Sequence, residues 1–179
     1  METLKAIEKR KSIRSYLDKP VDKSILEKII STGNKAPGAG AICITVITNK
    51  EFLKKIDDTT LDFMKNSGVE FMVQRSSLPG YRPLYDAPAM ILVSADAERG
   101  AANAITSATT MILAATDLGL GTCYVVSPIQ VIKNNSELLS PLGLPDGILP
   151  VAGVLLGYTD DPHKYERDRA PADNITYIE

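Results

Sequence analysis

Two arginines and a serine alternate near the N-terminus of the chain. In an extended segment, Arg10, Ser12 and Arg14 project to one side, whereas Ile13 points the opposite way, toward a core. Guanidinium groups offer planar donor forks and a serine hydroxyl adds a further hydrogen bond, so this trio suits a phosphate. A solvated basic face is the alternative interpretation.

The same spacing recurs near the C-terminus. Arg167 and Arg169 place two guanidinium groups on one side of an extended segment, although a solvated tail explains them equally well. The chain then ends with alternating apolar residues at 175–178. This alternation predicts a terminal strand that pairs with a sheet edge, including the edge of another subunit.

Two other segments suggest contacts with a flat ligand. Pro37, Gly38 and Gly40 form a small-residue turn before an apolar run, where glycine lets the backbone approach a ligand closely. A plain helix-to-strand turn is the competing interpretation. In the irregular segment 67–86, the aromatic rings of Phe71, Tyr81 and Tyr85 suit a substrate pocket wall, or they pack against the body of the domain.

The composition of the chain limits the class of protein and the kind of site that we expect. The chain has 179 residues, 44% of them hydrophobic, and a net charge of -2, which predicts one globular domain over residues 1–179. An acidic pI near 5.5 offers no global attraction to nucleic acid. No apolar run suits a membrane span or a signal peptide, so we expect a cytoplasmic protein. A single histidine and two cysteines outside any CxxC motif argue against a metal site or a catalytic triad.

The element that positions these segments is a helix over residues 101–117. It consists of small and apolar residues up to Asp117, carries no Lys or Arg, and is followed by Gly119 and Gly121, where a helix should end. A helix without a charged face should be covered on both sides. The cover is either a partner subunit or the rest of the same chain.

The other elements follow from hydrophobic periodicity. Apolar runs predict four strands, at residues 42–48, 89–95, 122–126 and 149–158. Helices are expected at 2–9, 22–33, 51–66 and from Ser127 onward, with Thr59 and Thr60 as a possible interruption of the third. The segment 67–86 is expected to be a long loop with one helical turn. Strands interleaved with helices predict a three-layer α/β or α+β domain.

Six short motifs, in this order, resemble the nitroreductase family. They are Arg10-Lys-Ser12-Ile-Arg14-Ser-Tyr16, Ala36-Pro37-Gly38-Ala39-Gly40, Asp86-Ala87-Pro88, Leu118-Gly-Leu-Gly-Thr-Cys123, Leu156-Gly157-Tyr158 and the final basic strand. The resemblance implies an α+β fold with a central mixed, largely antiparallel sheet. It also implies a homodimer with the long helix at the interface and a C-terminal arm, residues 159–179, that adds a strand to the partner.

The resemblance further implies a bound FMN between the subunits. Contacts to its ribityl chain and phosphate would come from Arg10, Ser12, Arg14, Arg167 and Arg169. The loop under the flavin ring would be formed by Pro37, Gly38 and Gly40, and the strand end against the ring by Tyr124, Val126 and Ser127, with a backbone N–H near flavin N5. No side chain is implied as a catalytic acid or base, because the flavin carries the chemistry.

The activity implied is ping-pong hydride transfer, with NAD(P)H as electron donor and a nitroaromatic, a quinone or another small conjugated molecule as acceptor. A separate dinucleotide site is not expected, because Gly119 and Gly121 follow a helix and lack a third glycine. One position departs from the family: Ala41 stands where an asparagine is common. This keeps open a flavin-binding protein without turnover, and dehalogenation or dehydrogenation are further alternatives.

Overall fold

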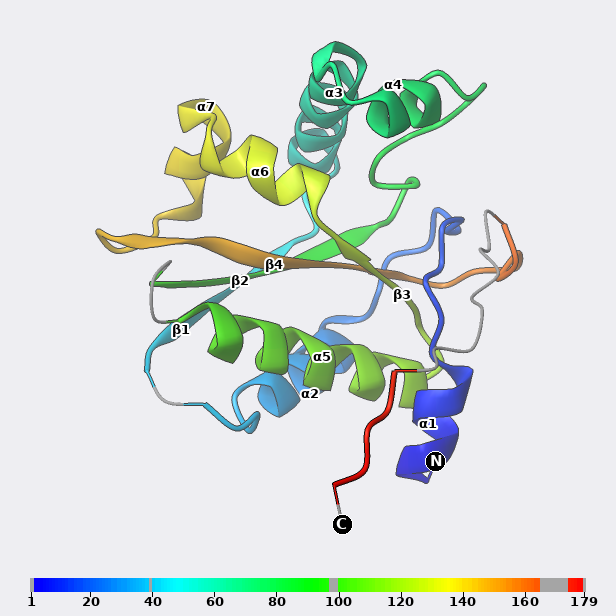
Figure 1. Cartoon of the computed structure of the whole chain (residues 1–179), viewed down its shortest axis with the longest axis vertical. Helices are drawn as coiled ribbons and strands as arrows, with labels where there is room; N and C mark the ends of the chain where they lie inside the picture. Colours follow the sequence, from blue (N-terminus) through cyan, green and yellow to red (C-terminus); the bar gives the residue numbers. More distant parts are fainter. Residues whose placement is uncertain (1, 39, 97–99, 165–173, 179) are drawn as a thin grey trace.

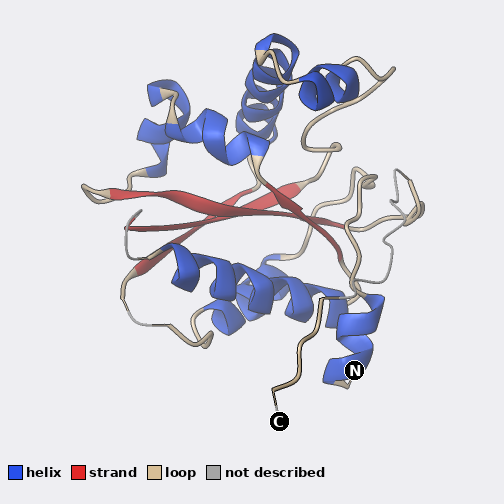
Figure 2. Ribbon diagram, viewed as in Figure 1, coloured by secondary structure: helices blue, strands red, loops and turns tan. Residues whose placement is uncertain are grey.

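A four-stranded antiparallel sheet forms the middle layer of the protein (Figures 1 and 2). The computed structural model describes residues 2–38, 40–96, 100–164 and 174–178. Its strands are β1 (Ile42–Ile47), β2 (Ala89–Asp96), β3 (Gly121–Val125) and β4 (Ile148–Gly157), in the order β1-β2-β4-β3. The four strands lie close to the predicted ranges. A single parallel bridge joins Ser12 to Thr122 at the β3 edge.

Helices cover both faces of this sheet. One face carries α2 (Lys23–Gly33) and α5 (Ala101–Asp117), and α1 (Thr3–Lys9) contacts α5. The other face carries α3 (Lys50–Asn66), α4 (Glu70–Ser76), α6 (Ser127–Lys133), α7 (Ser136–Leu139) and the 3₁₀ turn Ser140–Leu142. Each layer has its own core because strand side chains alternate: Met90 and Leu92 point toward α3 and α6, whereas Ile91 and Val93 point toward α2 and α5. The three-layer α+β prediction is confirmed.

Two local details differ from the alternatives that the sequence left open. Helix α3 runs unbroken through Thr59 and Thr60, so the possible interruption is absent. Both hydroxyls are accommodated within the helix, where they donate to the carbonyl oxygens of Lys55 and Ile56, one turn back, at 2.7 and 2.6 Å. The segment 67–86 contains the seven-residue helix α4, about two turns rather than one. No helix among the described residues combines the length and apolar character needed to cross a membrane.

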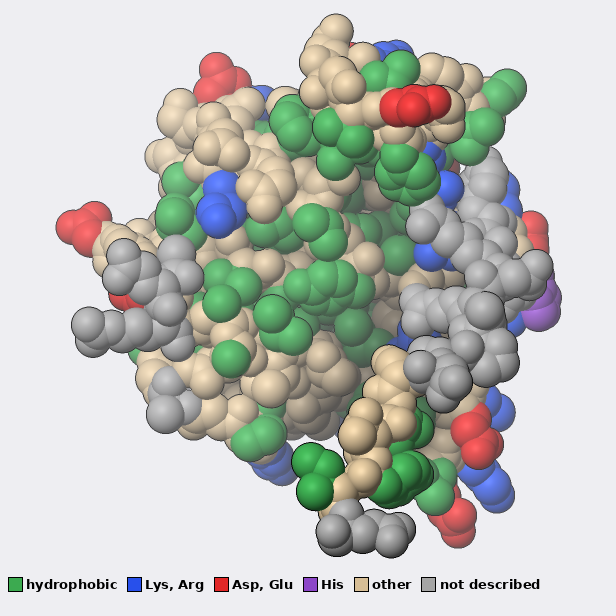
Figure 3. All heavy atoms as spheres, viewed as in Figure 1, with side chains coloured by type: hydrophobic (Ala, Val, Ile, Leu, Met, Phe, Trp, Pro, Cys, Tyr) green, Lys and Arg blue, Asp and Glu red, His purple; other side chains and the backbone are tan. Residues whose placement is uncertain are grey.

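Helix α5 is covered on one side only in the single chain. Its buried face includes Ala104, Ala108 and Met111, whereas Ile105 is 46% exposed on the opposite face. On the side of the molecule seen in Figure 3, hydrophobic side chains gather between α6 above and α5 below. At the C-terminus, residues 174–178 form no strand within this chain, and Tyr177 is exposed.

Candidate functional site

The N-terminal arginine segment lies along the edge of the sheet. The Ile13 N–H donates to the Thr122 carbonyl of β3 at 2.8 Å, and the Ile13 side chain is buried, as expected. This close approach needs glycine at position 121, because a Cβ there would lie 2.8 Å from Ile13 Cγ1. The segment is extended as predicted, and Ser12 and Arg14 are half-buried beside β3.

The end of β3 is exposed. Beyond the Ser12–Thr122 bridge, β4 is the only named strand that pairs with β3 among the described residues. Tyr124 and Val126 are 40% and 59% exposed although both are large and hydrophobic. Uncovered apolar side chains beside a free strand edge mark a surface that another group can cover.

A cavity of about 210 Å³ opens against this strand end, and we call it the β3 cavity. Seven of the predicted site residues line it, although they come from four separate parts of the chain. The seven are Arg14, Phe71, Tyr81, Tyr85, Tyr124, Val126 and Ser127. The structure therefore joins the residues expected at the flavin to those expected in the substrate pocket.

An aromatic wall closes one side of the β3 cavity. The Tyr81 and Tyr85 rings meet edge to face, with centroids 5.8 Å apart, and the guanidinium of Arg75 lies 5.2 Å from the Tyr81 centroid. Arg75 Nη2 also donates to Tyr85 Oη at 3.3 Å. Burial raises the pKa of Tyr81, so this phenol stays neutral at physiological pH.

Arg75 is the charged residue of the β3 cavity that sequence reasoning missed. The only signal was its place in a segment with three aromatic residues, which does not show that it contacts two of them. The contact depends on the backbone, because Gly80, Tyr85 and Asp86 all have left-handed φ values, of 69°, 54° and 59°. Two successive non-glycine residues in this region are uncommon, and such conformations gather at functional sites.

The glycine turn lies at the other end of α5. The Thr106 hydroxyl donates to the Pro37 carbonyl at 3.0 Å, and a Cβ on Gly38 would lie 2.7 Å from Asn103 Oδ1. The arginine segment instead runs past Thr116, which lines the same shallow pocket as Ile13. At about 1.5 Å per helical residue, Thr106 and Thr116 are about 15 Å apart. One chain therefore does not bring the turn, including Gly40, to the arginine segment.

Three predicted phosphate contacts remain to be placed: Arg10, Arg167 and Arg169. Arg10 caps the end of α1, where its backbone N–H donates to the Ala6 carbonyl, and it is half-buried. Arg167 and Arg169 lie outside the described residues.

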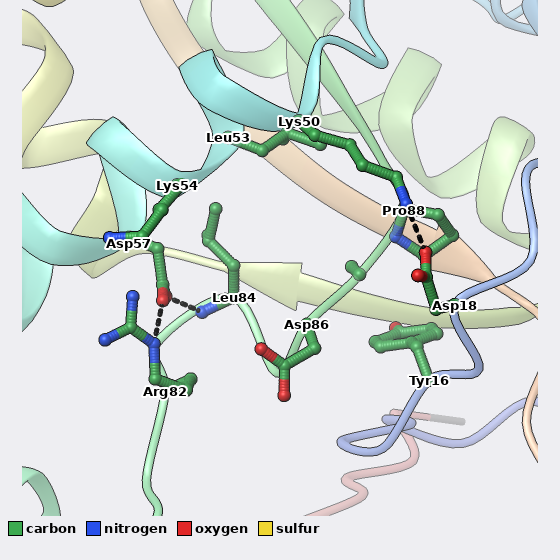
Figure 4. Close-up of a pocket in the computed structure, with 11 residues that line it drawn as sticks. Tyr16, Asp18, Lys50, Leu53, Lys54, Asp57, Arg82, Leu84, Asp86 and Pro88 are labelled. Atoms are coloured by element: carbon green, nitrogen blue, oxygen red, sulfur yellow. Dashed lines mark hydrogen bonds and ion pairs between the residues drawn. The ribbon is translucent and has the colours of Figure 1, made fainter.

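A larger cavity of about 500 Å³ lies under the start of α3 (Figure 4). Its cations are paired with carboxylates. Lys50 contacts Asp18 at 2.6 Å, Lys54 contacts Asp58 at 2.5 Å, and Arg82 bridges Asp57 and Asp58. Asp57 also accepts from the Leu84 N–H at 2.6 Å, which ties the loop before β2 to α3. These ion pairs hold the walls of the cavity together.

Two of the recognised motifs contribute to that larger cavity. Tyr16 and the Asp86-Ala87-Pro88 turn line it, and in Figure 4 the Asp86 carboxylate projects into the cavity. The Tyr16 hydroxyl is buried with no hydrogen-bond partner among the described residues. Burial raises the pKa of Tyr16, so the side chain acts as a neutral packing group.

Comparison with known proteins identifies the family. The model of the nitroreductase family matches residues 7–158. An FMN reductase [NAD(P)H] of Bacillus subtilis is 30% identical over 99% of this chain and 74% of its own length. A putative NADH dehydrogenase/NAD(P)H nitroreductase of Archaeoglobus fulgidus is 29% identical over 93% of this chain and 91% of its own length.

Solved structures share the fold. A nitroreductase with bound FMN from Desulfitobacterium hafniense has a TM-score of 0.88 and 26% identity, and the match covers 100% of both chains. A nitroreductase with bound FMN from Bacteroides fragilis has a TM-score of 0.84 and 24% identity, again over 100% of both chains. The resemblance carried by the six motifs is confirmed, and the chain belongs to the nitroreductase family.

Proposed function

We propose that this chain is one subunit of an FMN-dependent NAD(P)H oxidoreductase. Its acceptors are nitroaromatics, quinones or similar small conjugated molecules. The observation that carries the proposal is the β3 cavity, where Arg14 and the exposed strand end at Tyr124–Ser127 meet the aromatic wall. FMN-bound structures of the same fold and the NAD(P)H-dependent relative support this function.

The residues present fit FMN. A phosphomonoester carries close to two negative charges near neutral pH, and we assign Arg10, Ser12 and Arg14 to the phosphate and ribityl side of the molecule. Arg167 and Arg169 are assigned to the same group. The exposed apolar residues Tyr124 and Val126 suit one face of a flat ring.

The separation of the two flavin-binding segments along α5 favours a site that is shared between two chains. The Pro37–Gly40 turn and the Arg10–Arg14 segment lie near opposite ends of the helix in one chain, which favours a site that takes the turn from one chain and the arginine segment from the other. A two-fold partner packed on the exposed face of α5 would bring its own turn to the arginines of the first chain. We therefore propose a homodimer with two sites between its subunits.

FMN, when bound, supplies the redox chemistry by taking a hydride from NAD(P)H and passing electrons to the acceptor. The chain supplies position and environment. The backbone from Tyr124 to Ser127 would orient the ring, and the aromatic wall of Phe71, Tyr81 and Tyr85 would limit the access of water to it. Arg14, assigned to the phosphate and ribityl side, would contribute positive charge that stabilises the anionic cofactor. No acid or base of the chain needs to transfer a proton.

The first experiment is reconstitution with FMN followed by gel filtration and a visible spectrum. Flavin bands that elute with the protein, near one FMN per chain, support the cofactor assignment. Anaerobic addition of NADH and of NADPH then tests turnover, because an oxidoreductase of this kind must bleach with at least one of them. Retained flavin that neither donor bleaches would favour the second candidate, a flavin-binding protein without turnover. The sequence feature that supports this candidate is Ala41, which stands where an asparagine is common in the family.

Variants test the phosphate assignment. Arg14→Ala combined with Arg169→Ala should weaken FMN binding by several kcal/mol, since a hydrogen bond to a charged group contributes about 1.5 to 3 kcal/mol. Lys65→Gln, on the exposed surface of α3, removes one positive charge and is the control for the single variant Arg14→Ala. Unchanged FMN retention in the double variant during dialysis would contradict the assignment.

A further inference from the structure

The loop before β2 separates the two cavities, because its residues 81–86 line one cavity and the other in alternation. The odd-numbered residues line the β3 cavity, and they are Tyr81, Pro83 and Tyr85. The even-numbered residues line the larger cavity, and they are Arg82, Leu84 and Asp86. A contact that holds one side of this loop therefore also fixes the side chains on its other side.

Helix α3 holds the side of the loop that lines the larger cavity. The Asp57 carboxylate accepts from the Leu84 N–H at 2.6 Å and contacts the Arg82 guanidinium (Figure 4). Arg82 Nη2 also donates to Asp58 Oδ1 at 2.5 Å. The Asp57 side chain is 6% exposed, and hydrogen bonds are stronger in such a poorly hydrated place than in water. Two anchors thus flank Pro83, whose ring restricts the backbone further.

The opposite side of the loop carries two phenol rings of the aromatic wall. Tyr81 Oη donates to Met64 Sδ at 3.9 Å, and the Tyr81 and Tyr85 rings meet edge to face. Tyr85 has a left-handed φ of 54°, and its N–H donates to the Arg82 carbonyl at 3.1 Å. Such a backbone is unfavourable for a bulky residue and persists where neighbouring contacts hold it. The contacts with α3 just before this residue supply that support.

From this arrangement we infer that Asp57 and Arg82 position the aromatic wall against which the acceptor binds. The inference rests on the proposed function, which places a planar acceptor at the β3 cavity. Both residues line the larger cavity and neither lines the β3 cavity. They are therefore positioning residues, which act on the acceptor through Tyr81 and Tyr85.

A double variant separates this role from a general effect on stability. Asp57→Asn with Arg82→Ala removes the ion pair without leaving an unpaired buried carboxylate, so the unfolding temperature should stay close to that of the wild type. The new side-chain amide can still accept from the Leu84 N–H. The double variant therefore removes the Arg82 anchor alone.

Two acceptors report on the wall in the FMN-loaded protein. Nitrobenzene should bind against the wall, whereas ferricyanide takes one electron from reduced flavin without stacking on an aromatic ring. The ratio of kcat/KM for nitrobenzene to kcat/KM for ferricyanide should fall about two- to tenfold in the double variant, the scale of one aromatic contact. Arg82→Lys keeps a positive charge opposite Asp57 and should retain most of the ratio.

The tyrosine spectrum gives a second readout, which does not depend on activity. The chain has no Trp, so its near-ultraviolet circular dichroism without FMN comes mainly from seven Tyr and three Phe. In the double variant this signal should weaken, because the Tyr81–Tyr85 pair loses its fixed geometry. The far-ultraviolet signal, which reports the helices and strands, should be unchanged.

Two further variants are controls. Ile29 is fully buried in the core of the opposite layer, so Ile29→Val should lower the unfolding temperature but leave the acceptor ratio and the tyrosine signal at wild-type values. Tyr85→Leu removes one ring of the wall and should lower the ratio in the wild-type background. It should have a smaller effect in the double variant, where that ring is already displaced.

These measurements distinguish the inference from the proposed function. A wild type that reduces neither acceptor would contradict the proposed function, and the dichroism of the flavin-free chain would then decide whether Asp57 and Arg82 hold the wall. A double variant with both the ratio and the dichroism of the wild type overturns the inference. Equal changes in Ile29→Val also overturn it, because the effect would then be one of stability alone.

Discussion

Asp57 places a carboxylate inside the layer formed by α3 and α6. Its side chain is 6% exposed and is paired with Arg82, which is 29% exposed. Removing Arg82 would leave the buried charge with the Leu84 N–H as its hydrogen-bond donor. Breaking a buried pair on one side is costly, because desolvation of the remaining charge is no longer offset.

Arg82→Ala is therefore expected to lower the free energy of unfolding by about 2 kcal/mol, discounted for the partial exposure of Arg82. Urea unfolding at neutral pH measures it. Adding Asp57→Asn to this variant should restore most of the loss, because no unpaired charge remains. Lys50→Ala breaks the exposed Lys50–Asp18 pair and should cost less than about 1 kcal/mol. Equal losses for the two single variants would contradict the argument.

The pH dependence of stability should differ in sign between two adjacent aspartates. Burial raises the pKa of Asp57, so its stabilising contribution is present below the unfolded value of 3.8 and is lost as the pH rises through the folded value. Hydrogen bonds from Lys54 and Arg82 lower the pKa of Asp58, so its contribution is present above 3.8 and is lost as the pH falls.

Asp57→Asn should consequently gain stability relative to the wild type as the pH rises above about 4, whereas Asp58→Asn should lose stability relative to the wild type as the pH rises toward about 4 from more acidic values. Thermal unfolding at several pH values measures both trends. Parallel curves for the two variants would show that burial does not dominate at Asp57.

At the scale of elements, the helix α5 supports the glycine turn. The Thr106 hydroxyl reaches across to the Pro37 carbonyl, a contact between residues far apart in the sequence. Thr106→Val keeps the side-chain shape and removes this hydrogen bond, which the single hydroxyl proton shares with the Asn103 carbonyl at 2.9 Å. If the turn lies under the flavin ring, FMN binding should weaken by about fivefold, the equivalent of roughly 1 kcal/mol.

Flavin fluorescence measures this change. Thr110→Val is the matched control, because the Thr110 hydroxyl donates within the helix, to the Thr106 carbonyl. The two variants should have similar unfolding temperatures. Equal FMN affinity in the Thr106→Val and Thr110→Val variants would contradict the placement of the glycine turn in the flavin site.

Elements with a strong local pattern were predictable from the sequence. The small residues of α5 and the glycines after it gave its bounds, and the apolar runs gave all four strands. Helix α4 was missed because seven residues show little periodicity and Val69, at its N-cap, supplies no side-chain hydrogen bond. Arg75 was missed because its contacts depend on backbone turns at Gly80 and Tyr85. The separation of about 15 Å between the Pro37–Gly40 turn and the Arg10–Arg14 segment could not be predicted either, because it depends on where each segment packs along α5.

At the scale of the whole molecule, the exposed face of α5 and the end of β3 leave apolar surface uncovered. Ile105, Tyr124 and Val126 are each at least 40% exposed in the single chain. Hydrophobic side chains in this arrangement are typical of an interface between subunits. The same face separates the two halves of the proposed flavin site, so dimerisation and FMN binding should be coupled.

Ile105→Asp tests that coupling, because a partner packed on α5 would bury the new charge. We expect the variant to elute with a mass near the 19.3 kDa of one chain. It should also lose FMN at concentrations where the wild type retains it. Each flavin would then contact the arginine segment of one chain without the glycine turn of a partner. Light scattering combined with absorbance near 450 nm on a sizing column measures both properties in one run.

Phe63→Asp is the matched control for this prediction. Phe63 is 42% exposed on α3, on the opposite helical layer, so its substitution changes charge and exposed apolar area in a similar way without touching α5. That variant should keep the dimer mass and the flavin. A monomeric Ile105→Asp protein with full flavin would mean that one chain holds FMN by itself. A dimeric variant with full flavin would mean that the subunits meet elsewhere. Loss of mass and flavin together, in Ile105→Asp alone, is the result that a site shared across α5 requires.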